Sequence, residues 1–177
     1  MIMKFIPTHL EGAFVIEPEL RQDERGYFYR IFCQEELSKI GIDVTVRQAN
    51  QSFSLKKGTV RGMHFQYAPH REDKIVRCIK GQVYDVAVDM RKDSATYGRW
   101  HAEYLTEENK KMFFIPKGFA HGFQTLADDC VVEYLVSKFY APQHESGLRW
   151  DDPSLAIEWP IKNPIIISEK DTQWRFL

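Results

Sequence analysis

Short runs of apolar and β-branched residues, separated by turn-forming residues, recur along the whole chain. Runs of this length at intervals of roughly eight to twelve residues are typical of an antiparallel sandwich or barrel. We therefore expect an all-β fold. The expected strands cover residues 13–16, 27–32, 44–46, 74–79, 82–90, 101–105, 112–115, 122–126 and 131–139.

The segment 82–89 shows the two-residue period of a strand most clearly. One face is predicted to carry Tyr84, Val86 and Val88, and the other Val83, Asp85, Ala87 and Asp89. On this strand the Asp85 side chain is expected to point outwards into solvent. Helix signals are few. Residues 34–40 can form two turns that end at Gly41, and residues 106–110 and 151–155 are expected to form capped turns.

The size and charge of the chain narrow its class. Its 177 residues, 44% of them apolar and 14% aromatic, match a single packed domain that spans residues 1–177. The formal net charge of −1 argues against a nucleic-acid-binding protein, which normally carries a basic excess. An anionic ligand must therefore be held by a local cluster of cations.

The remaining global signals are absences. The three cysteines are widely spaced and form no CxxC pair, so neither a disulfide framework nor a zinc site is expected. No apolar run reaches the 18 or so residues that span a bilayer. The apolar start of the chain is broken at Pro7, before the core of a signal peptide could form. We expect a cytoplasmic protein with no membrane partner.

Two short motifs resemble those of the cupin superfamily. The segment 116–121, which reads Pro-x-Gly-x-x-His, is similar to the second cupin motif, in which His121 would point into a barrel. In metal-binding cupins a His-x-His segment and a downstream carboxylate complete the metal site. Here Gln66 replaces the second histidine and Lys74 stands at the carboxylate position. Because a cation repels a divalent ion, we expect no metal.

Longer motifs resemble one family within that superfamily. They cover residues 23–26, 61–66, 74–78, 85–89, 115–123, 150–153 and 157–160, in that order. Together they are similar to the dTDP-4-dehydrorhamnose 3,5-epimerases, from about Phe14 to Asp171. The resemblance implies a cupin jelly-roll barrel with a few short helices. It also implies an enzyme without a cofactor, acting on a nucleotide-diphospho-4-keto-6-deoxyhexose.

The resemblance also implies catalytic roles. The ketone at carbon 4 acidifies the hydrogens on carbons 3 and 5, so that a base can remove a proton and an acid can return it to the opposite face. His64 matches the base and Asp171 its carboxylate partner. Lys74 matches the cation that stabilises the enolate, and Tyr134 the proton donor. Without the resemblance, Lys74 would be expected at a solvated strand edge and Tyr134 in the core.

Substrate contacts and assembly are implied in the same way. The matching positions are Arg25, Gln48, Asn50, Arg61, His121, Tyr140, Glu145 and Lys170. The guanidinium groups of Arg25 and Arg61 suit a diphosphate, because their planar forks bind two oxygens at once. Tyr140 corresponds to the aromatic ring that stacks on the nucleotide base. The family implies a homodimer formed by exchange of N-terminal strands, with part of each site drawn from the partner.

Three positions depart from the family pattern. Arg21 stands where an aromatic is common, Arg30 replaces a glutamate, and Leu135 replaces a lysine beside Tyr134. The first two are expected near the nucleotide, so that cytosine is an alternative to thymine and a CDP-linked sugar an alternative substrate. Inversion at carbon 3 alone is an alternative to inversion at carbons 3 and 5.

Two other classes of protein stay open. A metal-dependent cupin is disfavoured by Gln66 and Lys74, and a non-catalytic sugar-nucleotide-binding protein by the complete set of an opposed acid and base. An epimerase of this kind would supply rhamnose or another deoxyhexose for surface polysaccharide.

Overall fold

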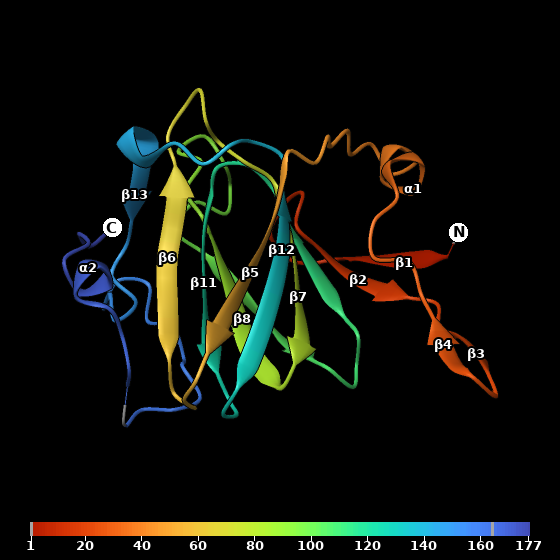
Figure 1. The fold of residues 1–177 in the computed structure, drawn as a ribbon. Coiled ribbons are helices and arrows are strands. Elements are labelled where there is room, and N and C mark those ends of the chain that lie inside the picture. The colour runs from red at the N-terminus through yellow and green to blue at the C-terminus, as the bar shows by residue number, and fades with distance from the viewer. Residues whose placement is uncertain (1, 164) are drawn as a thin grey trace.

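The computed structural model describes residues 2–163 and 165–177, and it consists mainly of two antiparallel sheets (Figure 1). The six-stranded sheet contains, in spatial order, β1 (Met3–Pro7), β2 (Phe14–Pro18), β10 (Met112–Ile115), β7 (Lys74–Lys80), β12 (Cys130–Val136) and β5 (Gln48–Ser54). The five-stranded sheet contains β13 (Glu145–Gly147), β6 (Val60–Gln66), β11 (Phe119–Thr125), β8 (Gln82–Asp89) and β9 (Trp100–Thr106). The predicted all-β class is confirmed.

The remaining elements are short. They are the hairpin of β3 (Arg21–Asp23) and β4 (Gly26–Phe28), the helices α1 (Gln34–Ser38) and α2 (Glu169–Thr172), and the 3₁₀ turn η1 (Pro142–His144). α1 is slightly shorter than predicted, and Gly41 after it has a positive φ of 81°, which suits the glycine expected there. Among the described residues, no helix has the length and apolar character needed to cross a membrane.

The apolar residues form a core between the two sheets and a second core outside one of them. Val83 and Ala87 of β8 pack into the central cluster, together with residues of β7, β10, β11 and β12. Tyr84, Val86 and Val88 pack on the opposite face, under the segment that follows β13. The predicted alternation along 82–89 is therefore confirmed, and β8 is buried on both faces.

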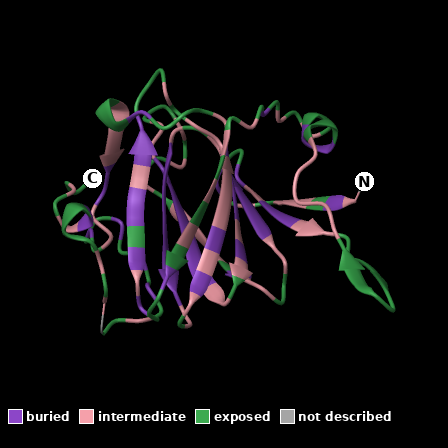
Figure 2. Ribbon diagram, viewed as in Figure 1, coloured by how far each residue is buried: buried purple, intermediate pink, exposed green. Residues whose placement is uncertain are grey.

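Two predicted strands are wrong. Residues 44–46 form no strand. Of these three residues only Val44 packs into the core, in a third apolar cluster that also contains Leu37 of α1. Of residues 27–32 only the first two belong to a strand, and they lie in the hairpin β3–β4. All six residues of its two strands are exposed. It projects from the body at the end of the molecule opposite to β6 and α2 (Figures 1 and 2).

Candidate active site

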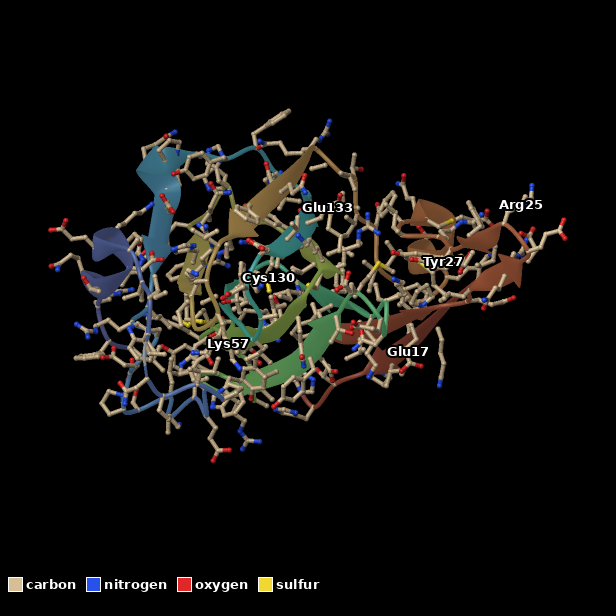
Figure 3. All side chains as sticks on the ribbon, turned by 60° about the horizontal axis from the view of Figure 1, so that its bottom comes forward. Glu17, Arg25, Tyr27, Lys57, Cys130 and Glu133 are labelled. Atoms are coloured by element: carbon tan, nitrogen blue, oxygen red, sulfur yellow. The ribbon has the colours of Figure 1, made fainter. Side chains whose placement is uncertain are left out.

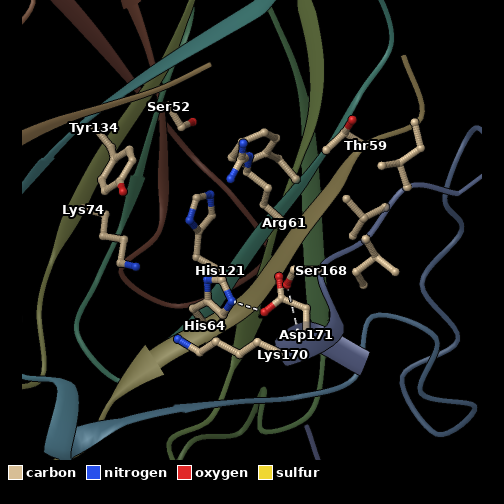
Figure 4. Close-up of a pocket in the computed structure, with 14 residues that line it drawn as sticks. Ser52, Thr59, Arg61, His64, Lys74, His121, Tyr134, Ser168, Lys170 and Asp171 are labelled. Carbon is tan, nitrogen blue, oxygen red and sulfur yellow. Dashed lines mark hydrogen bonds and ion pairs between the residues drawn. The ribbon is translucent and has the colours of Figure 1, made fainter. Parts of the chain in front are cut away.

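The site occupies a cavity that has two compartments. The first, of about 470 Å³, is bounded by β5, β6, β7, β11 and β12 and by the segment before and within α2 (Figure 4). The second, of about 380 Å³, extends towards Tyr140. His64, Lys74 and Tyr134 line both compartments. Three of the four predicted catalytic residues therefore lie where the compartments meet, and Asp171 lines the first.

His64 on β6 is paired with Asp171 on α2. The distance from His64 Nε2 to Asp171 Oδ1 is 2.6 Å, and the Asp171 side chain is buried. The same Oδ1 accepts a hydrogen bond from Trp174 Nε1 at 3.0 Å, and Oδ2 accepts one from the Gly62 amide at 3.2 Å. Because Nε2 is engaged, His64 Nδ1 is the nitrogen that can exchange a proton with a ligand.

The surroundings of Asp171 favour the carboxylate form. Burial by itself raises the pKa of Asp171, but the hydrogen bond and electrostatic interaction with His64, together with the Gly62 and Trp174 donors, bring that pKa below its usual value. α2 begins after Ser168, whose hydroxyl accepts a hydrogen bond from the Asp171 amide and caps the helix. The Asp171 carboxylate is thus ionised, and the capped start of α2 fixes the position of its backbone.

Lys74 lies on β7, an internal strand, and only 9% of its surface is exposed. The expectation of a solvated edge position is therefore wrong. Its ammonium lies 3.2 Å from Glu72 Oε1. Tyr134 lies on the adjacent strand β12, and its ring packs partly against the central cluster while its hydroxyl faces the cavity (Figure 4). Burial, followed by the negative charge of Glu72, raises the pKa of Tyr134, so the phenol stays protonated.

A second histidine–carboxylate pair lies beside the first compartment, which His121 lines. His121 of β11 stands directly opposite His64 in the β6–β11 ladder, and its Nε2 lies 2.9 Å from Asp85 Oδ2. Asp85 is fully buried, so the expectation that it points into solvent is wrong. A charged residue inside a strand that is apolar on both faces was the signal available in the sequence, because such a carboxylate needs a partner.

Glycines allow the two strands to approach beside these histidines. A Cβ atom on Gly62 would lie 2.6 Å from the Gly122 Cα atom, closer than any side chain tolerates. The ladder is irregular at this point, between His121 and Phe123. Only glycine at both positions permits this backbone contact, which brings β6 and β11 together under the cavity.

Most predicted substrate contacts also gather around the cavity. Arg61 lines the first compartment and donates to Ser54 Oγ and to the Phe53 carbonyl. Ser52 was not predicted; its Oγ lines the same compartment, is buried, and has no hydrogen-bond partner in the described part of the chain. A ligand atom would satisfy that hydroxyl.

The second compartment is closed by a polar network at its outer edge. Glu145 Oε2 accepts hydrogen bonds from Lys170 Nζ and from the Tyr140 hydroxyl, both at 2.7 Å. Gln48 Oε1 accepts a hydrogen bond from the Tyr140 amide at 2.6 Å. Asn50 of β5 lines the compartment beside them. The five predicted residues of this region therefore lie together.

Arg25 is the exception. It lies at the tip of the hairpin β3–β4, 85% of its side chain is exposed, and it pairs with Asp23 at 2.5 Å. Figure 3 places it at the outer end of that hairpin, at the opposite end of the molecule from the C-terminal helix α2. Within one chain a surface hairpin therefore carries Arg25 away from the other predicted site residues, and its contact with the substrate stays a prediction.

The three departures from the family pattern fall in different places. Arg21 lies on the same exposed hairpin. Arg30 is paired at 2.9 Å with Glu36 of α1. Glu36 also accepts a hydrogen bond from the Met3 amide and so links α1 to β1. Leu135 packs in the cluster next to α1, on the opposite face of β12 from Tyr134. It therefore leaves the Tyr134 hydroxyl undisturbed.

The residues that stand at the metal-ligand positions of cupins are engaged with one another. The Gln66 amide nitrogen donates to Glu72 Oε2 at 3.0 Å, and the Lys74 ammonium contacts the other oxygen of that carboxylate. Within residues 2–163 and 165–177, no group of three or more histidine, cysteine, aspartate or glutamate side chains is arranged to hold an ion.

Comparisons with known proteins agree with this geometry. The family model described as dTDP-4-dehydrorhamnose 3,5-epimerase matches residues 7–177. The protein of that name from Methanothermobacter thermautotrophicus is 47% identical over 174 residues, which cover 97% of this chain and 93% of that protein. The one from Escherichia coli K12 is 41% identical over 170 residues, 96% of this chain and 91% of that protein.

Solved structures share the fold over nearly the whole chain. The Bacillus anthracis dTDP-4-dehydrorhamnose 3,5-epimerase with TDP and PPi bound has a TM-score of 0.95 at 40% identity, covering 99% of both chains. The Legionella pneumophila epimerase in complex with dTDP-4-keto-L-rhamnose has a TM-score of 0.93 at 39% identity, covering 98% of this chain and 92% of that one. This chain therefore belongs to the dTDP-4-dehydrorhamnose 3,5-epimerase family.

Proposed function

We propose that the protein converts dTDP-4-dehydro-6-deoxyglucose to dTDP-4-dehydrorhamnose by inverting carbons 3 and 5. It is an isomerase, and the proposal requires no redox cofactor because each proton is removed and then replaced. One observation carries the proposal: His64, Lys74 and Tyr134 meet where the two compartments join, in a chain of this family. Simple binding of a sugar nucleotide requires no such opposed acid and base.

The base in this proposal is His64. Asp171 engages Nε2 and so favours the tautomer in which Nδ1 carries the lone pair. When Nδ1 takes the proton from carbon 3 or carbon 5, an imidazolium forms, and the buried carboxylate stabilises its charge. The C–H electron pair moves into the ring and onto the oxygen at carbon 4, giving an enolate.

Lys74 and Tyr134 complete the proposed cycle. The Lys74 ammonium would donate to the enolate oxygen, and a cation fixed in a partly apolar wall stabilises such an oxyanion more than water does. Tyr134 would then donate its proton to the carbon from the face opposite to His64. Solvent exchange restores both groups for the second inversion.

The remaining contacts are proposed for the nucleotide and the diphosphate. Arg61 and Ser52 in the first compartment and the imidazole of His121 suit phosphate oxygens. Tyr140 at the edge of the second compartment would stack on the base, with Glu145 and Lys170 beside it. Gln48 and Asn50 line the same compartment and would contact the ligand there.

We further propose a homodimer in which the hairpin β3–β4 of one copy reaches the cavity of the other. Tyr27 and Phe28 on this hairpin are 53% and 60% exposed, and burial against a second copy would remove that apolar surface from water. Arg25 at its tip would then add a cation to the Arg61 and Lys74 that line the cavity of the other copy. The proposal also treats residues 1–177 as one domain and places the protein in the cytoplasm, where its free cysteines stay reduced.

The test is proton NMR in deuterated water. Purified protein is incubated with dTDP-4-keto-6-deoxyglucose, and deuterium at carbons 3 and 5 is followed over time. We expect deuterium at both carbons and the appearance of the rhamno product. Deuterium at carbon 3 alone would show that the protein is a 3-epimerase. The same incubation is repeated with the CDP-linked sugar, and faster turnover of that sugar would show that the substrate carries cytidine instead of thymidine. Tight binding without exchange would replace it with a binding protein.

A further inference from the structure

A largely enclosed acidic side chain contacts the proposed enolate-stabilising lysine. Glu72 precedes β7 by two residues, only 12% of its side chain is exposed, and its Oε1 lies 3.2 Å from Lys74 Nζ. It lines the second compartment together with His64 and Tyr134. The roles proposed above leave this carboxylate without a function.

Glu72 is itself held from behind. The Gln66 amide donates to Glu72 Oε2 at 3.0 Å and to the His70 carbonyl at 3.1 Å. Gln66 Oε1 accepts the Ala141 amide at 2.7 Å, and Gln66 is 5% exposed. Every polar atom of Gln66 is therefore used, which fixes the orientation of its amide and with it the position of Glu72 Oε2.

The chain of contacts runs from Gln66 to Glu72 and from Glu72 to Lys74, and it ends at the cavity. An ammonium group has three N–H donors, so one can bind Glu72 while the others face a ligand oxygen. A long lysine side chain without such a partner would lose this single placement, since its four-carbon stem has many rotamers. The carboxylate also offsets the cost of enclosing the ammonium in the wall.

We propose that Glu72 is a positioning residue: held by Gln66, it fixes the Lys74 ammonium at the place where the oxygen on carbon 4 of the substrate lies. This inference rests on the proposed function. It also explains the glutamine at position 66, where a metal-binding cupin carries a histidine: here the amide supports a carboxylate instead of an ion.

Tyr134 provides a second readout. Burial raises the pKa of its hydroxyl first, and the charge of Glu72 raises it further, while Arg61 acts in the opposite sense. The other ionisable side chains that line the two compartments are Arg61, His64, Lys74, His121, Tyr140, Glu145, Lys170 and Asp171. Replacing Glu72 with glutamine removes one negative charge from beside Tyr134, so the Tyr134 pKa should fall.

The experiment compares Glu72→Gln, Glu72→Asp and the wild-type protein with dTDP-4-keto-6-deoxyglucose as substrate. We expect Glu72→Gln to lower kcat by about 10- to 100-fold through displacement of Lys74, while KM changes far less. The basic limb of its pH profile should move to lower pH. Glu72→Asp keeps the charge and should recover part of kcat. Glu103→Gln removes a carboxylate paired with Lys111 that lines neither compartment, and it should match the wild-type protein.

The Tyr134 pKa is measured separately, by NMR titration of tyrosine labelled at the ring carbon that bears the oxygen. The Tyr134→Phe protein identifies the signal. This titration uses no substrate, so it tests the inference even where the wild-type protein shows no isomerisation, a result that would refute the proposed function instead. An unchanged kcat, or an unchanged Tyr134 pKa in Glu72→Gln, overturns the inference. Thermal unfolding shows whether Glu72→Gln is folded. If it is not folded, the kcat of Glu72→Asp is compared with that of the wild-type protein instead.

Discussion

The substitution Asp171→Asn tests the proposed base most sharply, because its two oxygens face three N–H donors. Oδ1 accepts from His64 and Trp174, and Oδ2 accepts from the Gly62 amide. An asparagine has only one oxygen. Whichever way its amide is turned, an NH₂ group faces at least one N–H donor. The variant therefore loses both the negative charge and a complete set of hydrogen bonds.

The expected magnitudes follow from those contacts. A hydrogen bond to a charged group contributes about 1.5–3 kcal/mol, and its loss from the imidazolium lowers the rate by about 10- to 150-fold. Asparagine also no longer favours the His64 tautomer with the proton on Nε2, which lowers the rate further. We therefore expect kcat to fall by about 10²- to 10⁴-fold in total. The unmatched buried donor should lower the free energy of unfolding by about 1–3 kcal/mol.

The assay measures solvent deuterium entering carbons 3 and 5 under saturating substrate, with denaturant unfolding run on the same preparations. Asp151→Asn is the matched control, because Asp151 pairs with Arg149 on the surface near the chain end and lines neither compartment. A fall in unfolding free energy with unchanged deuterium exchange would refute the argument, since Asp171 would then support only the fold.

Three further predictions concern the acid, the fold and metal ions. Tyr134→Phe removes the proposed donor on the far face, so deuterium exchange through His64 should persist while net inversion falls; equal losses of both would contradict this. For Asp89, burial raises the pKa, but hydrogen bonds from Arg91, Ser94 and Thr96 bring it from the usual 3.8 to about 2. A lowered pKa in the folded state stabilises the protein above pH 4 and loses that effect as the pH falls towards 2. Asp89→Asn should therefore be about 2 kcal/mol less stable at pH 7, a gap that narrows below pH 4 in denaturant titrations. Finally, Gln66 and Lys74 are both engaged with Glu72, so chelation with EDTA should leave activity unchanged; loss of activity restored by one added metal would refute the assignment.

The sequence predicted β7, β8, β10 and β12 and missed β5 and β6, which are two of the strands that line the cavity. β8 alternates cleanly and packs on both faces, so its pattern is strong. β5 reads Gln-Ala-Asn-Gln-Ser-Phe-Ser and was not predicted, because a strand that presents polar side chains to a cavity has lost the apolar half of its alternation. The same polar residues, Gln48, Asn50 and Ser52, are the ones that line the site.

The site was predictable only in part, for reasons of distance along the chain. His64 and Asp171 are 107 residues apart, and no local pattern joins them; family resemblance paired them and the fold brings them to 2.6 Å. Asp85 was misjudged because it was taken as an outward-facing position of an alternating strand, whereas both faces of β8 are buried. Arg25 was predicted at the site, yet its hairpin extends away from its own chain. Its proposed role at the site depends on a second copy of the chain.

The most direct test of the central claim is deuterium incorporation into the sugar by His64→Ala. The claim is that one imidazole, oriented by Asp171, removes the protons from carbons 3 and 5. The account predicts that in deuterated water the variant binds dTDP-4-keto-6-deoxyglucose and leaves both carbons fully protonated while the wild-type protein labels them. Labelling of either carbon at the wild-type rate would contradict the account, because another group would then be the base.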